Sequence, residues 1–134
     1  MSTYALDTNI ISYYMANDKM IRGKIHLFLY EGNQLIIPTV VYYEIRRGLL
    51  AKSAPKKSVT FDQLCKMSEF GTMDRETGEI AAAIYAGLRK KGALLEDADI
   101  LIAASCIQHG YPLVTNNTDH FKNIDGLRLT NWAA

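Results

Sequence analysis

Residues 3–15, TYALDTNIISYYM, decide the fold. Thr3 to Leu6 has the short apolar pattern of a strand, and the apolar side chains that follow recur at helical spacing. Asp7 therefore stands at a strand-to-helix junction. Strands that alternate with helices predict an α/β domain with a mostly parallel sheet, and the usable crevice of such a sheet lies beyond the carboxyl ends of its strands.

The same alternation continues to the end of the chain. Further strands are predicted at residues 34–37, 71–73, 113–115 and 127–129, and helices at 20–30, 40–49, 59–70, 75–91 and 97–108. This order predicts a three-layer α/β/α sandwich around a roughly five-stranded sheet, and 134 residues fit one domain. The helices on either side of a polar connector that contains Pro55 are expected to form a protruding hairpin within residues 39–70.

Composition narrows the class of protein. With 49% hydrophobic and 22% charged residues, the chain has an ordinary globular composition rather than that of a disordered protein. No apolar stretch approaches the roughly 18 residues of a spanning helix, and the amino terminus lacks a secretory signal, so we expect a cytoplasmic protein without a membrane attachment. Cys65 and Cys106 are far apart and have no metal-type spacing, which predicts reduced, buried thiols.

Acidic residues lie at the ends of apolar runs. They are Asp7, Glu44, Asp97, Asp99 and Asp119. Carboxylates that several segments bring to one place repel each other, and they persist there only if a divalent cation or shared protons offset the repulsion. Asp7 follows the first strand and Asn116, Asn117 and Asp119 follow the strand at 113–115, so both groups are expected at the same edge of the sheet. The pattern predicts a carboxylate metal site.

Each acid also has a purely structural interpretation. Asp7 and Asp97 could cap helices, and Asp99 in a first helical turn would favour the helix dipole. Residues two apart on a helix point to different sides, so Asp99 ranks above Asp97 as a ligand. Glu44 is the most telling acid, because a lone buried glutamate on an apolar helix is costly without a partner, whereas an exposed one carries no information.

Four segments, in order, resemble a PIN domain, and the nearest likeness is to the VapC-type toxins. They are LDTN at 6–9, YEIRRG at 43–48, DADILIAA at 97–104 and LVTNN at 113–117. The resemblance implies a magnesium-dependent ribonuclease, with manganese as a plausible substitute, that cleaves single-stranded RNA. It further implies the toxin of a type II toxin–antitoxin pair, a homodimer held inactive by a small VapB-like antitoxin. By resemblance tRNA is the leading substrate class, while rRNA and mRNA stay open.

Carried over by position, Asp7 matches the first metal-binding aspartate of the family, Glu44 its helical glutamate, and Asp99 the aspartate before the apolar run. In the resulting hypothesis Asp7 and Asp99 bind the first ion, and Glu44 orients or deprotonates the attacking water. Asp97 or Asp119 assists a second ion or positions waters. Polar support is expected from Thr8, Asn9, Thr115 and Asn117.

The fourth acid departs from the family pattern. Family members place it just before the phenylalanine that matches Phe121, but here His120 adjoins Phe121 and Asp119 lies one step earlier. Either Asp119 serves after a small shift of the loop, or Asn116 or Asn117 substitutes as a neutral oxygen ligand, or the site has three firm acids. His26, His109 and His120 lack the spacing of a zinc site, and no Gly-rich phosphate loop is present.

Basic and aromatic residues surround the predicted site. The net charge is only +1, so any binding of nucleic acid must be local. Arg46, Arg47 and Lys52, on or just beyond the glutamate helix, are best placed to contact RNA phosphates, although they could be solvated helix residues or bind an acidic antitoxin segment. The pairs Tyr13-Tyr14 and Tyr42-Tyr43 could stack on bases, but helical spacing favours a place in the core.

Two other classes of function remain as alternatives. A phospho-acceptor receiver domain also gathers acids at strand ends and binds magnesium, but receivers lack the helical glutamate, and their lysine after the fourth strand has no clear counterpart here. A non-catalytic RNA- or protein-binding module of PIN type would keep the fold without cleavage.

Overall fold

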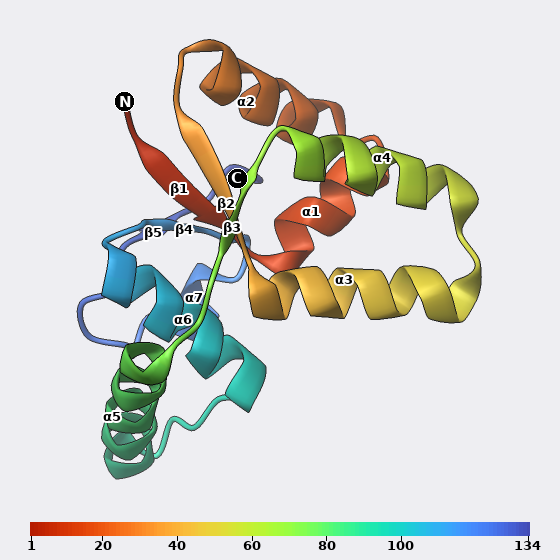
Figure 1. Ribbon diagram of the computed structural model, residues 1–134. Coiled ribbons are helices and arrows are strands. Elements are labelled where there is room, and N and C mark those ends of the chain that lie inside the picture. The colour runs from red at the N-terminus through yellow and green to blue at the C-terminus, as the bar shows by residue number, and fades with distance from the viewer.

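The computed structural model describes residues 1–134 and contains a five-stranded sheet (Figure 1). All strand pairs are parallel, and the strands lie in the order β3-β2-β1-β4-β5. Their bounds are β1 Thr3–Leu6, β2 Gln34–Pro38, β3 Glu69–Gly71, β4 Leu113–Val114 and β5 Leu129–Thr130. The first strand of the chain is therefore the central strand of the sheet, with β2 on one side and β4 on the other.

Helices cover both faces of this sheet. In Figure 1, α1 to α4 lie on one face, and α5 and α6 lie on the other. The bounds are α1 Thr8–Met15, α2 Lys19–Tyr30, α3 Thr39–Lys52, α4 Pro55–Lys66, α5 Arg75–Lys91, α6 Asp97–His109 and α7 Thr118–Phe121. The predicted three-layer α/β sandwich with a parallel sheet is confirmed. None of these helices has the length and apolar character required to cross a membrane.

The predicted bounds of α4, β3 and β5 are wrong, and α7 was not predicted. Helix α4 begins at Pro55, inside the predicted connector, because proline fits the first turn of a helix, where no backbone N–H is needed. It ends at Lys66, so β3 can occupy residues 69–71 rather than 71–73. Strand β5 begins at Leu129 instead of residue 127, and the four-residue helix α7 is too short to give a periodic signal.

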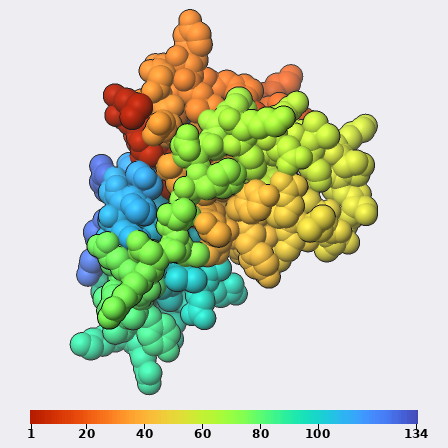
Figure 2. All heavy atoms as spheres, viewed as in Figure 1, coloured from red at the N-terminus to blue at the C-terminus, as the bar shows by residue number.

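Helices α3 and α4 run side by side and extend away from the sheet (Figure 1). The chain reverses between them at Ser53, which ends α3 in the left-handed conformation with φ 46°. Their outer end forms the yellow projection in Figure 2. Helix α3 also contacts α6 of the opposite layer, so its first half lies next to the sheet edge where β1 and β4 end.

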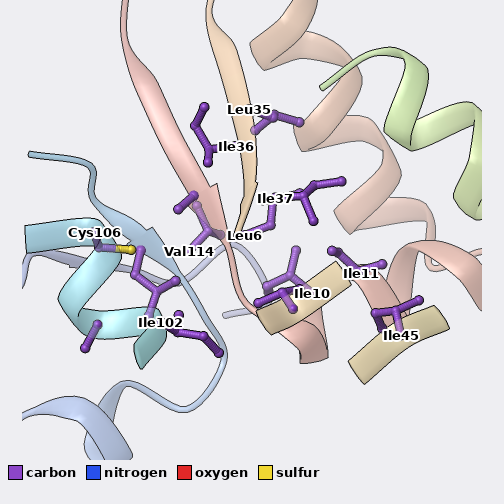
Figure 3. Close-up of a cluster of buried hydrophobic side chains, with 14 of the residues drawn as sticks. Leu6, Ile10, Ile11, Leu35, Ile36, Ile37, Ile45, Ile102, Cys106 and Val114 are labelled. Atoms are coloured by element: carbon purple, nitrogen blue, oxygen red, sulfur yellow. The ribbon is translucent and has the colours of Figure 1, made fainter. Parts of the chain in front are cut away.

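The core is one continuous cluster of 26 buried apolar residues on both sides of the sheet (Figure 3). Leu35, Ile36 and Ile37 are consecutive in β2 and all buried, as expected for a parallel strand that is covered on both faces. Cys106 belongs to this core, as predicted, whereas Cys65 is half-buried rather than buried, and the two are not joined by a disulfide. This packing fixes β1, α1, α3 and α6 relative to one another.

Candidate active site

Asp7 lies at the point where β1 ends and α1 begins, and its side chain is only 5% exposed. It caps α1, since its Oδ1 accepts a hydrogen bond from the Thr8 backbone N–H at 2.8 Å. Its Oδ2 accepts from the Thr115 hydroxyl at 2.8 Å and from the Asn9 amide at 3.0 Å. Thr115 is in turn held by the backbone N–H of Asn117 at 3.0 Å. Three of the four predicted polar supports, Thr8, Asn9 and Thr115, thus contact Asp7 directly, and Asn117 acts through Thr115.

Burial raises the pKa of Asp7 above its ordinary value, and it does so despite this cage of donors. Loss of water around the carboxylate is the largest cause. The hydrogen bonds from Thr115 and Thr8 act in the opposite direction, and the negative charge of Asp99 raises the pKa further. Asp7 and Asp99, 92 positions apart in the chain, therefore lie within range of each other's charge.

Glu44 reaches the same place from α3. Its Oε1 accepts a hydrogen bond of 3.0 Å from the hydroxyl of Thr8, whose backbone N–H binds Asp7. Glu44 is half-buried, and its other carboxylate oxygen makes no hydrogen bond within the chain. Thr8 therefore connects the two acids, and Glu44 has the partner that its position on an apolar helix requires.

Asp99 occupies the first turn of α6 and pairs with a residue that the sequence had not marked as a partner. The Nε2 of His120 lies 2.9 Å from Asp99 Oδ2, with side-chain exposures of 43% and 24% respectively. Because a carboxylate only accepts, the imidazole N–H donates in this contact. One signal could have suggested it: His120 follows β4 by a few residues, and that strand ends at the same sheet edge as β1.

No hydrogen bond or shared partner links Asp97 or Asp119 to these three acids. Asp97 is exposed and borders a hollow against α5, beside Ala81 and Tyr85, because its position on α6 points it away from Asp99. Asp119 is exposed on α7 and forms no hydrogen bond or ion pair. No three or more His, Cys, Asp or Glu side chains come close enough together to form a preassembled metal cage. The structure thus differs from the predicted convergence of all the acids.

Asn116 ties the loop after β4 to α1. Its backbone N–H donates to Asn9 Oδ1 at 3.0 Å, and its side-chain amide donates to the Tyr13 hydroxyl at 3.0 Å. The side-chain carbonyl oxygen of Asn116 accepts a hydrogen bond of 3.3 Å from the side-chain amide of Asn131. Asn116 is therefore engaged as a structural tie, whereas the Asn117 side chain makes no hydrogen bond and is the freer neutral oxygen. The roles of Tyr13 and Asn131 were not foreseen.

The basic residues of α3 divide into two kinds. Arg46 forms an ion pair of 2.6 Å with Asp62 of α4, and its guanidinium lies 5.3 Å and 5.0 Å from the ring centres of Tyr42 and Phe61. It links α3 to α4, so part of its guanidinium is already engaged by Asp62. Arg46 is therefore a weaker candidate for a contact with RNA phosphates than Arg47 or Lys52.

Arg47 and Lys52 are exposed and free of carboxylate partners. The guanidinium of Arg47 lies 5.1 Å from the ring centre of Tyr43. The pKa of Arg47 is raised first by the Tyr43 hydroxyl and to a smaller degree by the nearby Glu44 carboxylate. Lys52 and Lys57 border a pocket of about 200 Å³ that Glu44 also lines. Positive charge therefore lies next to Glu44.

The chain is similar to known proteins along almost its whole length. The family model of the PIN domain matches residues 4–127. Ribonuclease VapC1 of Methanocaldococcus jannaschii is 33% identical over 100 residues, which cover 73% of this chain and 70% of that protein. The tRNA(fMet)-specific endonuclease VapC of Salmonella typhimurium is 27% identical over 138 residues, covering 98% of this chain and 99% of that protein.

Solved structures give the same result at the level of the fold. A chain of VapBC2 from Rickettsia felis, bound to a DNA fragment from their promoter, superposes with a TM-score of 0.89. The match covers 97% of this chain and 98% of that chain, at 26% sequence identity. The resemblance that the four segments predicted thus extends to the whole arrangement of strands and helices.

Proposed function

The chain belongs to the PIN-domain family and, within it, to the VapC ribonucleases, and on that basis we propose that it is a toxin endoribonuclease that requires a divalent cation. Residues 1–134 act as one nuclease domain, from which the α3–α4 pair projects. The reaction is hydrolysis of a phosphodiester in single-stranded RNA.

One observation carries this proposal. Asp7 is only 5% exposed, and its pKa is raised by burial and by the charge of Asp99. Glu44 is linked to Asp7 through Thr8, whose hydroxyl binds Glu44. Three segments far apart in the sequence supply these acids. A fold that only needed a helix cap at position 7 would not need two further carboxylates in the neighbourhood of that cap.

The side chains fit a hard cation that keeps several of its waters, such as Mg²⁺ or Mn²⁺. The carboxylates of Asp7, Asp99 and Glu44 offer hard oxygen ligands, and one or two carboxylates suffice for Mg²⁺ in sites of this kind. Asp7 Oδ1 accepts only one hydrogen bond and Asp99 Oδ1 accepts none, so both acids keep free lone pairs. We assign Asp7 and Asp99 as the residues that hold the cation, which when bound offsets charge on the phosphate and makes a water molecule more acidic.

The other residues act on the attacking water and on the position of the acids. Thr8 fixes Oε1 of Glu44, which leaves Oε2 to orient the water and accept its proton. Asn9 and Thr115 keep Asp7 in one rotamer. Asp119 and the amide of Asn117, exposed on the loop and helix after β4, are the remaining candidates for positioning water or a second cation.

The proposed substrate class is tRNA, cut in a single-stranded region. The support is the relative from Salmonella typhimurium, which is named a tRNA(fMet)-specific endonuclease. Unpaired loops expose the base edges and faces that specific readout of RNA requires. Arg47 and Lys52 are the cations placed to receive its phosphates.

The proposed partner is a small VapB-like antitoxin that holds a homodimer of this chain inactive in the cytoplasm. The support is the likeness to VapBC2 of Rickettsia felis. Light scattering of the chain purified alone, and then with the product of any short reading frame next to its gene, tests both assemblies. A monomer that gains no mass in the second experiment contradicts the proposal.

The alternatives are separated by topology and by assay. Receiver domains have the strand order 2-1-3-4-5, whereas this sheet has the order 3-2-1-4-5 and the chain matches the PIN domain, so the receiver interpretation is set aside. A non-catalytic binding module would bind RNA and leave it intact.

The deciding experiment is cleavage of total RNA in the presence and absence of Mg²⁺, with sequencing of the new ends. We expect cuts in tRNA by the wild type, and losses of roughly 10²-fold or more for Asp7→Asn and Asp99→Asn. Asp125→Asn is the matched control, because Asp125 is 95% exposed and pairs only with Lys91. Wild-type cleavage by Asp7→Asn would defeat the assignment.

A further inference from the structure

The side of α3 that faces solvent carries an unusual group of exposed residues. From it we propose that Tyr43 and Arg47 form a nucleotide subsite, in which an unpaired RNA base stacks on the Tyr43 ring and a neighbouring phosphate pairs with Arg47. The subsite rests on the proposed function, because it identifies how the RNA is held next to Glu44.

The two adjacent tyrosines of α3 have different environments. Tyr42 is half-buried, and its ring centre lies 5.5 Å from the ring centres of both Phe61 and Phe70. Tyr43 is 58% exposed and packs on no other aromatic ring. The expected place in the core is therefore right for Tyr42 and wrong for Tyr43. An exposed aromatic ring offers a stacking face that every base can use.

The two adjacent arginines divide in the same way. Arg46 is taken up by Asp62 and two rings, whereas Arg47 has no carboxylate within ion-pair distance. The guanidinium of Arg47 instead lies over one face of the Tyr43 ring, 5.1 Å from its centre, so an RNA base would stack on the opposite face. An aromatic ring and an unpaired arginine side by side are the two components of sequence-tolerant binding to single strands, which combines stacking with a phosphate contact.

The pair also lies beside Glu44, the residue that we propose orients the attacking water. Tyr43 and Arg47 are four residues apart, on one side of α3, and Leu50, which is 75% exposed, continues that side by another turn. Arg47 comes three residues after Glu44 on α3, so the two side chains are neighbours on the helix surface. A nucleotide held by this pair would therefore be a close neighbour of the phosphate at the reacting centre.

Charge favours RNA over a protein segment as the occupant. The whole chain has a net charge of only +1, so a polyanion needs a local cationic track. Lys52 at the end of α3 and Lys57 of α4 border the pocket that Glu44 also lines, so they add two further cations near the proposed reacting centre. An apolar protein partner would not require unpaired cations at this position.

The test measures binding without turnover. A fluorescently labelled single-stranded RNA that spans a mapped cut site is titrated with Asp7→Asn protein, and fluorescence anisotropy gives the affinity. Adding Tyr43→Ala should weaken binding by roughly 5- to 100-fold, the range for one lost stacked base. Tyr43→Phe should stay within about twofold of the parent, and Tyr43→Leu should behave like Tyr43→Ala, because leucine keeps apolar bulk but has no stacking face.

Arg47→Ala tests the phosphate contact. It should weaken binding and reduce the slope of log affinity against log salt by about 1. Tyr30→Ala is the matched control for a surface tyrosine, since Tyr30 is 90% exposed on α2, and it should leave affinity unchanged. Melting curves identify any variant whose fold has changed.

Three results would overturn the subsite: no binding of RNA by the parent, unchanged affinity in both Tyr43→Ala and Tyr43→Leu, or weaker binding of an antitoxin with RNA affinity intact. The proposed function fails separately. If the Asp7→Asn protein still cleaves RNA, the catalytic assignment is wrong and the subsite is unaffected. If the wild type cleaves RNA but the Tyr43 variants bind it normally, the subsite is wrong and the proposed function is unaffected.

Discussion

Burial raises the pKa of Asp7 above 3.8 even though three donors hold its carboxylate. The folded protein therefore binds this proton more tightly than the unfolded chain does. Stability accordingly falls as pH rises from 3.8 to the folded pKa of Asp7, and the loss persists at neutral pH. A buried carboxylate that lowers stability at the edge of a sheet is typical of a functional site.

Asp7→Asn should therefore remove this pH-dependent penalty while abolishing cleavage. The amide NH₂ of the variant cannot accept the hydrogen bonds that Thr115 and Asn9 donate, so the informative quantity is how the difference in melting temperature from the wild type changes with pH. We expect this difference to shift in favour of the variant as the pH rises from 3.8 through the folded pKa of Asp7, because only the ionised carboxylate carries the burial penalty. Calorimetry from pH 3.5 to 7.5 measures it, with Asp125→Asn as the control that shows no such shift. A difference that is the same at both ends of this range would contradict this explanation.

Thr8 supplies the second prediction at this scale. Thr8→Val keeps the shape of the side chain and the backbone N–H that binds Asp7, but it removes the hydroxyl that holds Glu44. Cleavage should fall by roughly 10- to 100-fold, as for other residues that orient a reacting group. Thr8→Ser restores the hydroxyl and should recover most of the activity. Equal activity in the valine and serine variants would show that Glu44 needs no such support.

At the scale of the element, local signals explain which parts of the fold the sequence predicts. Helix α5 is predicted at its full length, because Asp74 and Thr77 form a capping box at its start and Gly92 ends it in the left-handed conformation with φ 67°. Helix α4 has no side-chain cap, so its apolar spacing alone places it too late in the chain. Short strands such as β3 and β5 carry too few residues to fix their own bounds.

The candidate site divides by the same logic. Asp7 and Thr115 could be placed from sequence because each directly follows a strand of a parallel sheet. The contact of Asp99 with His120 and the bond from Thr8 to Glu44 could not, because each depends on how helices pack and on which rotamer a side chain adopts. Both contacts depend on the tertiary structure, which no local sequence pattern determines.

The α3–α4 pair gives a prediction for adjacent arginines with opposite roles. Arg46→Ala removes the ion pair with Asp62 and the stacking on two rings, so it should lower stability by roughly 1 kcal/mol. Arg47→Ala should change stability by less than about 0.5 kcal/mol, since the side chain is exposed. Urea unfolding measures both. If Arg47→Ala destabilises as much as Arg46→Ala, the division between a structural and a free arginine is wrong.

Over the whole molecule, strand order decides where the acids lie. The order 3-2-1-4-5 sends the chain from β1 outward to β2 on one side and places β4 on the other. Successive strands are therefore added on one side of β1 as far as β3 and on its other side from β4 onward. The point between β1 and β4 is a topological switch point, where ligands bind in open α/β sheets. Asp7 follows the first of these strands and Thr115 the second. Helices α3 and α6 then add Glu44 and Asp99 from opposite layers.

A cation held by Asp7 and Asp99 would join elements from both layers of the molecule. Its binding should therefore stabilise the whole folded domain against unfolding. At a concentration of 100 times its dissociation constant, a ligand specific for the folded state adds about 2.7 kcal/mol. We expect Mg²⁺ or Mn²⁺ to raise the melting temperature of the wild type and of Asp125→Asn in proportion to the logarithm of its concentration. Asp7→Asn and Asp99→Asn should lose this rise.

Asp97→Asn is the control for Asp99→Asn, because the two residues are close in sequence on α6 but Asp97 lies against α5. The Asp97→Asn variant should retain the full rise in melting temperature. The cation binds elsewhere if Asp97→Asn loses the effect while Asp99→Asn keeps it. If neither Mg²⁺ nor Mn²⁺ changes the melting temperature of the wild type, the proposal of a bound cation is wrong. Glu44 would then have to activate the water without a metal ion.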